Sequence, residues 1–130
     1  MLNNDSQTYV NKRMADPEPW MPLTYICSPY SGDTRTNVQK AKRYSRFAML
    51  EDVIPVTPHL LYPRFMDDKN PEEHEKAMRF NYVLLGKCEE LWVFGGVITR
   101  GMQAEINLAK KRNMMIRWFN SECEEVPAYA

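Results

Sequence analysis

Apolar residues follow two different spacings along this chain, and each spacing predicts a different kind of element. Four short runs are rich in bulky apolar and β-branched residues, which is typical of strands in a parallel sheet. Between these runs, apolar residues recur every three or four positions, which is typical of amphipathic helices. The expected strands are residues 23–27, 53–57, 91–94 and 114–119, and the expected helices are about 35–50, 71–88 and 100–112.

Strands that alternate with helices indicate βαβ units, which build a parallel sheet through right-handed crossovers. Pro55 lies in the second expected strand, and a proline there favours an edge position because it has no N–H to donate. We therefore expect an α/β fold, a small flavodoxin-like or Rossmann-like three-layer sandwich of about four to five parallel strands in an order near 2-1-3-4. In that order the loops 28–36 and 95–101 meet at one crevice.

Polar flanks and turn residues set the expected limits of the domain. Residues 1–20 are polar and aperiodic and predict an N-terminal tail, residues 120–130 predict a C-terminal tail, and residues 21–119 form the single expected domain. Residues 58–70 predict a long irregular loop, and loops of that length are commonly functional or mobile.

Two helix starts carry clear local signals. Asn70 is expected to cap the second helix, with Pro71 at its first position and Glu73 completing a capping box. Thr99 is expected to cap the third helix.

Charge and cysteine usage exclude several classes of protein. The chain of 130 residues holds 17 basic and 17 acidic side chains, so no basic field indicates nucleic acid or an anionic membrane as a partner. No apolar run reaches transmembrane length. The 3 cysteines form an odd set without metal-type spacing, which favours a reduced cytoplasmic protein. No dinucleotide or phosphate-loop motif is present, so we expect no cofactor and no metal.

Glu105 is the most informative single residue. Met102, Ile106 and Ala109 form the apolar stripe of the third helix, and Glu105 lies beside that stripe. Burying a carboxylate there is expensive without a partner. Early in a helix that follows a strand, the side chain points towards the crevice where open α/β sheets bind ligands. Glu105 is therefore the candidate catalytic acid or nucleophile, and the alternative is a structural glutamate.

The third strand–helix unit resembles the nucleoside 2-deoxyribosyltransferase superfamily and its nucleotide N-glycosidase branch. The motif that carries the likeness is Thr99-x-Gly101-x-x-x-Glu105-Ile106-x-x-Ala109. Thr57-Pro58-His59 is similar to the Thr-x-His of the nucleotide-hydrolysing branch, and residues 28–35 are similar to its first loop, a phosphate cradle. The amino-acid sequence of residues 25–32 and 57–63 also resembles that of a narrower phage and bacterial family of this fold, to which no chemistry is assigned. The likeness covers roughly residues 23–119.

The resemblance implies an enzyme that cleaves or transfers at the N-glycosidic bond of a nucleoside or nucleoside 5′-monophosphate. Glu105 would be its nucleophile or the stabiliser of an oxocarbenium-like cation. Hydroxyls and free amides near helix N-termini suit a phosphate or sugar, and the alternative is an ordinary capped turn. The candidate binding residues are Ser28, Tyr30, Ser31, Gly32, Arg35, Thr99 and Gly101.

The group that moves the proton is less defined. The superfamily often has an aspartate on the helix before the third strand, and here the aligned position holds Asn81 or Tyr82. His59 and a loop acid, Asp67 or Asp68, are the candidates to replace it, and Asn81 is either a sugar contact or a satisfied core amide. Trp92 has a ring that suits stacking on a base, but its place in a strand predicts that it lies in the core, and His74 is expected on the surface.

A second function class stays open because the aligned carboxylate is missing. The same crevice would serve a non-catalytic module that binds or sequesters a nucleotide, of phage or host-defence type. A third class is an interaction protein that keeps only the fold. By resemblance, a homodimer or higher homo-oligomer is expected, with the neighbour completing the site.

Overall fold

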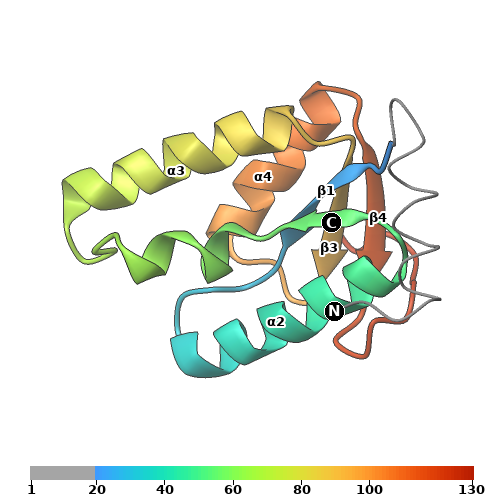
Figure 1. Ribbon diagram of the computed structural model, residues 1–130, viewed down its shortest axis with the longest axis horizontal. Helices are drawn as coiled ribbons and strands as arrows, with labels where there is room; N and C mark the ends of the chain where they lie inside the picture. The colour runs from blue at the N-terminus through green and yellow to red at the C-terminus, as the bar shows by residue number, and fades with distance from the viewer. Residues whose placement is uncertain (1–19) are drawn as a thin grey trace, which may run out of the picture.

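The computed structural model describes residues 20–130 and places the four expected strands in one parallel sheet (Figure 1). β1 (Leu23–Cys27) pairs with β2 (Ile54–Val56) and with β3 (Glu90–Phe94), and β4 (Met115–Phe119) pairs with β3. The order is β2-β1-β3-β4. This order confirms the predicted α/β sandwich and its 2-1-3-4 arrangement.

The alternation of side chains along each strand supplies two separate cores. On one face of the sheet, Tyr25 and Cys27 belong to a cluster with the buried residues of two helices, α3 (Pro71–Gly86) and α4 (Arg100–Lys111). On the other face, Ile26 packs with residues of α2 (Thr34–Leu50). The helices therefore form the two outer layers that Figure 1 shows, with α2 on one side and the pair α3 and α4 on the other.

Two sequence signals for strand position and helix start are confirmed. β2 is an edge strand, as Pro55 predicted. Thr99 caps α4, because its Oγ1 accepts a hydrogen bond of 3.3 Å from the amide of Met102. The cap fixes the direction in which the first turn of α4 leaves the sheet.

The predicted capping box of α3 is wrong in one part. Asn70 does cap the helix, since its Oδ1 accepts from the amides of Glu72 at 3.0 Å and Glu73 at 3.3 Å. The Glu73 carboxylate, however, accepts from the amide of Asp67 at 3.2 Å. The amide of Asn70 is already bonded to the carbonyl of Asp67, so the usual capping-box partner is occupied.

The segment after β2 is more regular than the expected irregular loop. It contains two short 3₁₀ helices, η1 (Pro58–Leu60) and η2 (Tyr62–Arg64), each with a proline in its first turn. The ring of Tyr62 packs edge-on against Phe80 of α3, with centroids 5.4 Å apart. This contact attaches the segment to α3 and fixes one wall of the crevice.

Residues 120–130, predicted as a tail, fold back along β4. Glu125 forms an antiparallel bridge with Phe119, and the amide of Val126 donates to the carbonyl of Trp118 at 2.9 Å. The Tyr129 hydroxyl donates to the carbonyl of Phe119 at 2.9 Å and accepts from the amide of Gly96. Backbone groups at the end of the sheet thereby find partners. The other predicted tail, residues 1–20, lies outside the described residues except for Trp20.

Among the described helices, none combines the length and the apolar character that crossing a membrane requires.

Candidate functional site

A cavity of about 510 Å³ opens at the carboxyl ends of the central strands. Ser28 follows β1, His59 follows β2, and Thr99 follows the loop after β3; all three line the cavity. The first three turns of α3 and the first turns of α4 form its walls. This is the crevice where the strand order reverses, which is the usual ligand site of open parallel sheets.

Glu105 lies at the inner wall of this cavity, with its side chain only 6 % exposed. The Tyr25 hydroxyl donates a hydrogen bond to Oε2, and the Cys27 thiol lies 3.5 Å from Oε1 as the second donor. Both donors come from β1, where a spacing of two residues puts them on the face that α4 covers. The carboxylate is therefore held in one orientation by two neighbours in the core.

Burial controls the charge of this carboxylate. Desolvation raises the pKa of Glu105 to about 7, and the hydrogen bonds from Tyr25 and Cys27 offset part of that rise. The same surroundings raise the pKa of the Tyr25 phenol and of the Cys27 thiol, chiefly through burial and then through the Glu105 charge, so both remain protonated donors. Burial therefore makes this carboxylate easier to protonate than an ordinary glutamate.

Two buried polar atoms at the cavity have no partner among the described residues. Ser28 is 1 % exposed and its Oγ makes no hydrogen bond, and the Oδ1 of Asn81 is equally unpartnered. Both residues line the cavity. Unpaired buried polar atoms are rare and costly, so these two are suited to a ligand that brings hydrogen-bonding groups of its own.

The ring of His59 is held in the wall of the cavity by two contacts. Its Nε2 lies 3.0 Å from the Ser28 carbonyl, and its ring stacks on Tyr30 with centroids 4.8 Å apart. Burial lowers the pKa of His59, although the bond to Ser28 opposes the shift. The ring is therefore neutral near pH 7 and donates to a backbone carbonyl, which suits it to holding the Ser28–Tyr30 loop in place.

The predicted phosphate cradle is only partly assembled. Ser31, Thr99 and Gly101 line the cavity together with Ser28 and Tyr30, but Gly32 and Arg35 do not. Asp33 caps α2 by accepting from the amide of Thr36 at 3.2 Å, and Arg35 in the first turn of that helix is exposed. Arg100, at the start of α4, is the arginine that does line the cavity.

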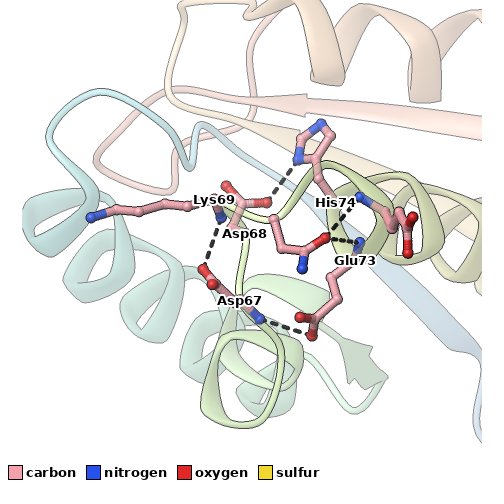
Figure 2. A network of polar contacts seen from close by, with 7 residues as sticks. Asp67, Asp68, Lys69, Glu73 and His74 are labelled. Atoms are coloured by element: carbon pink, nitrogen blue, oxygen red, sulfur yellow. Dashed lines mark hydrogen bonds and ion pairs between the residues drawn. The ribbon is translucent and has the colours of Figure 1, made fainter.

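The two loop acids differ in position. Asp67 is exposed and does not line the cavity, whereas Asp68 does. Asp68 Oδ1 lies 2.8 Å from His74 Nδ1, and His74 also lines the cavity (Figure 2). His74, expected on the surface, is a half-exposed residue of the cavity rim. Among the described residues, no group of three or more metal-ligating side chains is arranged to hold a metal ion.

Several neighbours of the site carry no sequence motif. The sequence did not indicate a role for Tyr25 and Cys27, because a buried strand normally supplies packing rather than chemistry. Their one signal is a phenol and a thiol on the same face of β1. Tyr62 and Tyr82 also line the cavity. Trp92 is fully buried in the core, as expected, with the Arg117 guanidinium 4.7 Å from its ring centroid.

Comparison with known protein families adds one finding. No curated protein matches the chain. A family described as a domain of unknown function, DUF7768, matches residues 22–119, which include all four strands and the three helices of the sandwich. Because this match spans most of the 130 residues, the chain belongs to the DUF7768 family.

Proposed function

We propose that the protein cleaves or transfers at the N-glycosidic bond of a nucleoside or nucleoside 5′-monophosphate. The observation that carries the proposal is Glu105, a nearly buried carboxylate held by Tyr25 and Cys27 at the inner wall of a cavity. A carboxylate so held needs no large rearrangement before it acts. A structural glutamate would normally be paired with a cation, and its two partners here are neutral donors.

The chemistry of this bond suits such a group. Breaking it generates positive charge at the anomeric carbon, and a carboxylate beside that carbon either stabilises the cation or bonds to it. Because the surroundings are of low polarity, the electrostatic effect on the developing charge is larger than in water. The sugar then passes to water in a hydrolase or to a second base in a transferase.

The remaining cavity fits a nucleoside in size and in lining. Its volume of about 510 Å³ falls within the range of small-molecule sites. Tyr30, Tyr62 and Tyr82 supply aromatic surface for a planar base. The hydroxyl of Ser28, the amide of Asn81 and the N-terminus of α4 supply polar groups for the sugar or a phosphate, with Arg100 as the nearby cation.

The direct test is release of free base. Purified protein is incubated with a panel of nucleosides and 5′-monophosphates, with and without an acceptor base, and free base is measured by chromatography. We expect release from at least one substrate by the wild type, and a loss of at least a hundredfold in Glu105→Gln. An exposed helical variant, Asn107→Ala, is the matched control and retains the rate.

A second candidate function is a non-catalytic nucleotide-binding module. It is favoured by Asn81 and Tyr82, which line the cavity where the resembled superfamily often has an aspartate. This function predicts no base release from any substrate. It also predicts that at least one nucleotide of a panel raises the melting temperature of the protein. This rise is lost in Ser28→Ala and kept in Glu105→Gln.

Two expectations complete the proposal. We propose a cytoplasmic location, since Cys27, Cys88 and Cys123 are free thiols and Cys27 serves as a protonated donor to Glu105. The homodimer, in which a neighbour completes the site, stays a prediction of the resemblance.

A further inference from the structure

An aspartate–histidine pair lies at the rim of the cavity that Glu105 lines. The carboxylate of Asp68 lies 2.8 Å from Nδ1 of His74, and both side chains line the cavity (Figure 2). A carboxylate on one ring nitrogen fixes the orientation of the imidazole and leaves the other nitrogen for chemistry. Here Nε2 of His74 makes no hydrogen bond to any described residue.

The pair is held by the turn that starts α3. The amide of Asp67 donates to the Glu73 carboxylate at 3.2 Å, and Oδ1 of Asp67 accepts from the amide of Lys69 at 3.0 Å (Figure 2). Asn70 then caps the helix whose first turn carries His74. The contacts on both sides of Asp68 restrict the backbone that presents its carboxylate to His74.

The other histidine of the cavity and two of its glutamates already make hydrogen bonds within the protein. His59 directs Nε2 to the Ser28 carbonyl, and Glu73 accepts from the amide of Asp67. Glu105 is bonded to Tyr25 and Cys27. An imidazole exchanges a proton near neutral pH more readily than a tyrosine or an arginine. Among the described residues of the cavity, His74 is therefore the side chain best placed to exchange a proton with a ligand.

We propose that His74, oriented by Asp68, is the general acid that protonates the leaving base, an inference that rests on the proposed function. As the bond between C1′ and the base breaks, its electron pair goes to the base. The imidazolium of His74, whose Nδ1–H donates to Asp68, gives its Nε2 proton to a nitrogen or oxygen of that base and becomes neutral. An oxygen of the Glu105 carboxylate forms a bond to the anomeric carbon, C1′. In hydrolysis, water then attacks C1′ and the bond between C1′ and the Glu105 carboxylate breaks. His74 Nε2 accepts one proton of the attacking water and becomes an imidazolium again.

Leaving groups of different basicity test this role. The wild type, His74→Gln and Asp68→Asn are assayed on a natural nucleoside and on the 4-nitrophenyl glycoside of the same sugar, whose phenolate leaves without protonation. On the nucleoside, we expect kcat/KM to fall about a hundredfold or more in His74→Gln, the usual contribution of a general acid. A smaller loss is expected in Asp68→Asn. On the nitrophenyl glycoside, we expect both variants to stay within threefold of the wild type.

Lys76→Gln is the matched control, because Lys76 is exposed on the same helix and does not line the cavity. Equal losses on both substrates in His74→Gln, or no loss on either, would overturn the role of His74. If the wild type and Glu105→Gln differ while His74→Gln matches the wild type, the proposed function stands and this inference fails. If the wild type releases neither leaving group, both fail together.

Discussion

Tyr25 and Glu105 lie 80 residues apart in the sequence, and a hydrogen bond from the phenol to the carboxylate joins them in the core. The bond connects the central strand β1 to α4 at the point where the cavity opens. It therefore links the packing of the sheet to the charge of the candidate nucleophile. Any change in this contact is expected to alter both the pKa of Glu105 and the geometry of its carboxylate.

Removing the hydroxyl group of Tyr25 tests that link. Tyr25→Phe deletes a hydrogen bond that lowers the pKa of Glu105, so the pKa rises above its present value of about 7. One bond to a charged group corresponds to roughly one pKa unit or more. The acidic limb of the kcat/KM profile should move to higher pH by that amount, with the largest loss of rate at or below pH 7.

Tyr44→Phe is the matched control for this experiment. Tyr44 is also fully buried, its hydroxyl has no partner among the described residues, and it lies in the core on the opposite face of the sheet. The pH profile of this variant should coincide with that of the wild type. Coincident profiles for Tyr25→Phe and Tyr44→Phe would contradict the assigned role of Tyr25.

Glu105 is expected to cost stability at neutral pH. Its pKa is about 7 in the folded protein against 4.5 for an ordinary glutamate, so the folded state binds the proton more tightly. The free energy of unfolding therefore falls as the pH rises from about 4.5 to 7. The full difference is on the order of 3 kcal/mol. Urea unfolding should show Glu105→Gln more stable than the wild type at pH 8 and nearly equal to it at pH 4.5. A variant that is less stable at pH 8 would show that the carboxylate is structural.

The unpaired hydroxyl of Ser28 should matter for ligand and not for folding. Ser28→Ala removes a buried hydroxyl that has no protein partner among the described residues, so the free energy of unfolding should change by less than about 1 kcal/mol. The KM for the substrate should rise about fivefold to tenfold, the effect of one lost hydrogen bond. Thr24→Val is the control, since Thr24 has an equally buried, unpaired hydroxyl that does not line the cavity. A rise in KM in both variants, or in neither, would be inconsistent with a ligand contact at Ser28.

Gly101 offers a test of close ligand approach at the start of α4. A Cβ at this position meets no atom within 4 Å, so Gly101→Ala is free of clashes. Alanine in a helix is favoured over glycine by up to about 1 kcal/mol, and the melting temperature should rise slightly. Because Gly101 lines the cavity, the added methyl group should raise the KM. A more stable variant with an unchanged KM would place the substrate away from this turn.

The sheet was predictable because its signals are local. The bulky apolar runs of the strands, the apolar spacing of the helical stretches and Pro55 at the edge are all read from neighbouring residues. Their alternation along the chain predicts a parallel sheet, and the observed order β2-β1-β3-β4 matches the expected 2-1-3-4. The position of Glu105 beside the apolar stripe of α4 follows from the same helical spacing. Burial at this position was therefore expected before the structure.

The details of the site depend on contacts between distant residues, which the spacing of side chains does not encode. Nothing near Tyr25 or Cys27 in the sequence indicates that they face Glu105. Arg35 has the charge expected of a phosphate ligand, but the Asp33 cap starts α2 before it, and Arg35 lies exposed outside the cavity. His74 is exposed, as expected, but its contact with Asp68 at the cavity was not predicted, because Asp68 lies in a segment whose two 3₁₀ helices the sequence did not predict.

The central claim is that the Glu105 carboxylate acts at the anomeric carbon. The most direct measurement takes the substrate found by base release and follows the mass of the intact protein and of its peptides during rapid quenching. We predict a gain of one sugar equivalent on the peptide that carries Glu105, and neither adduct nor base release in Glu105→Gln. Base release that persists at the wild-type rate in Glu105→Gln, with no adduct in either protein, would contradict the account.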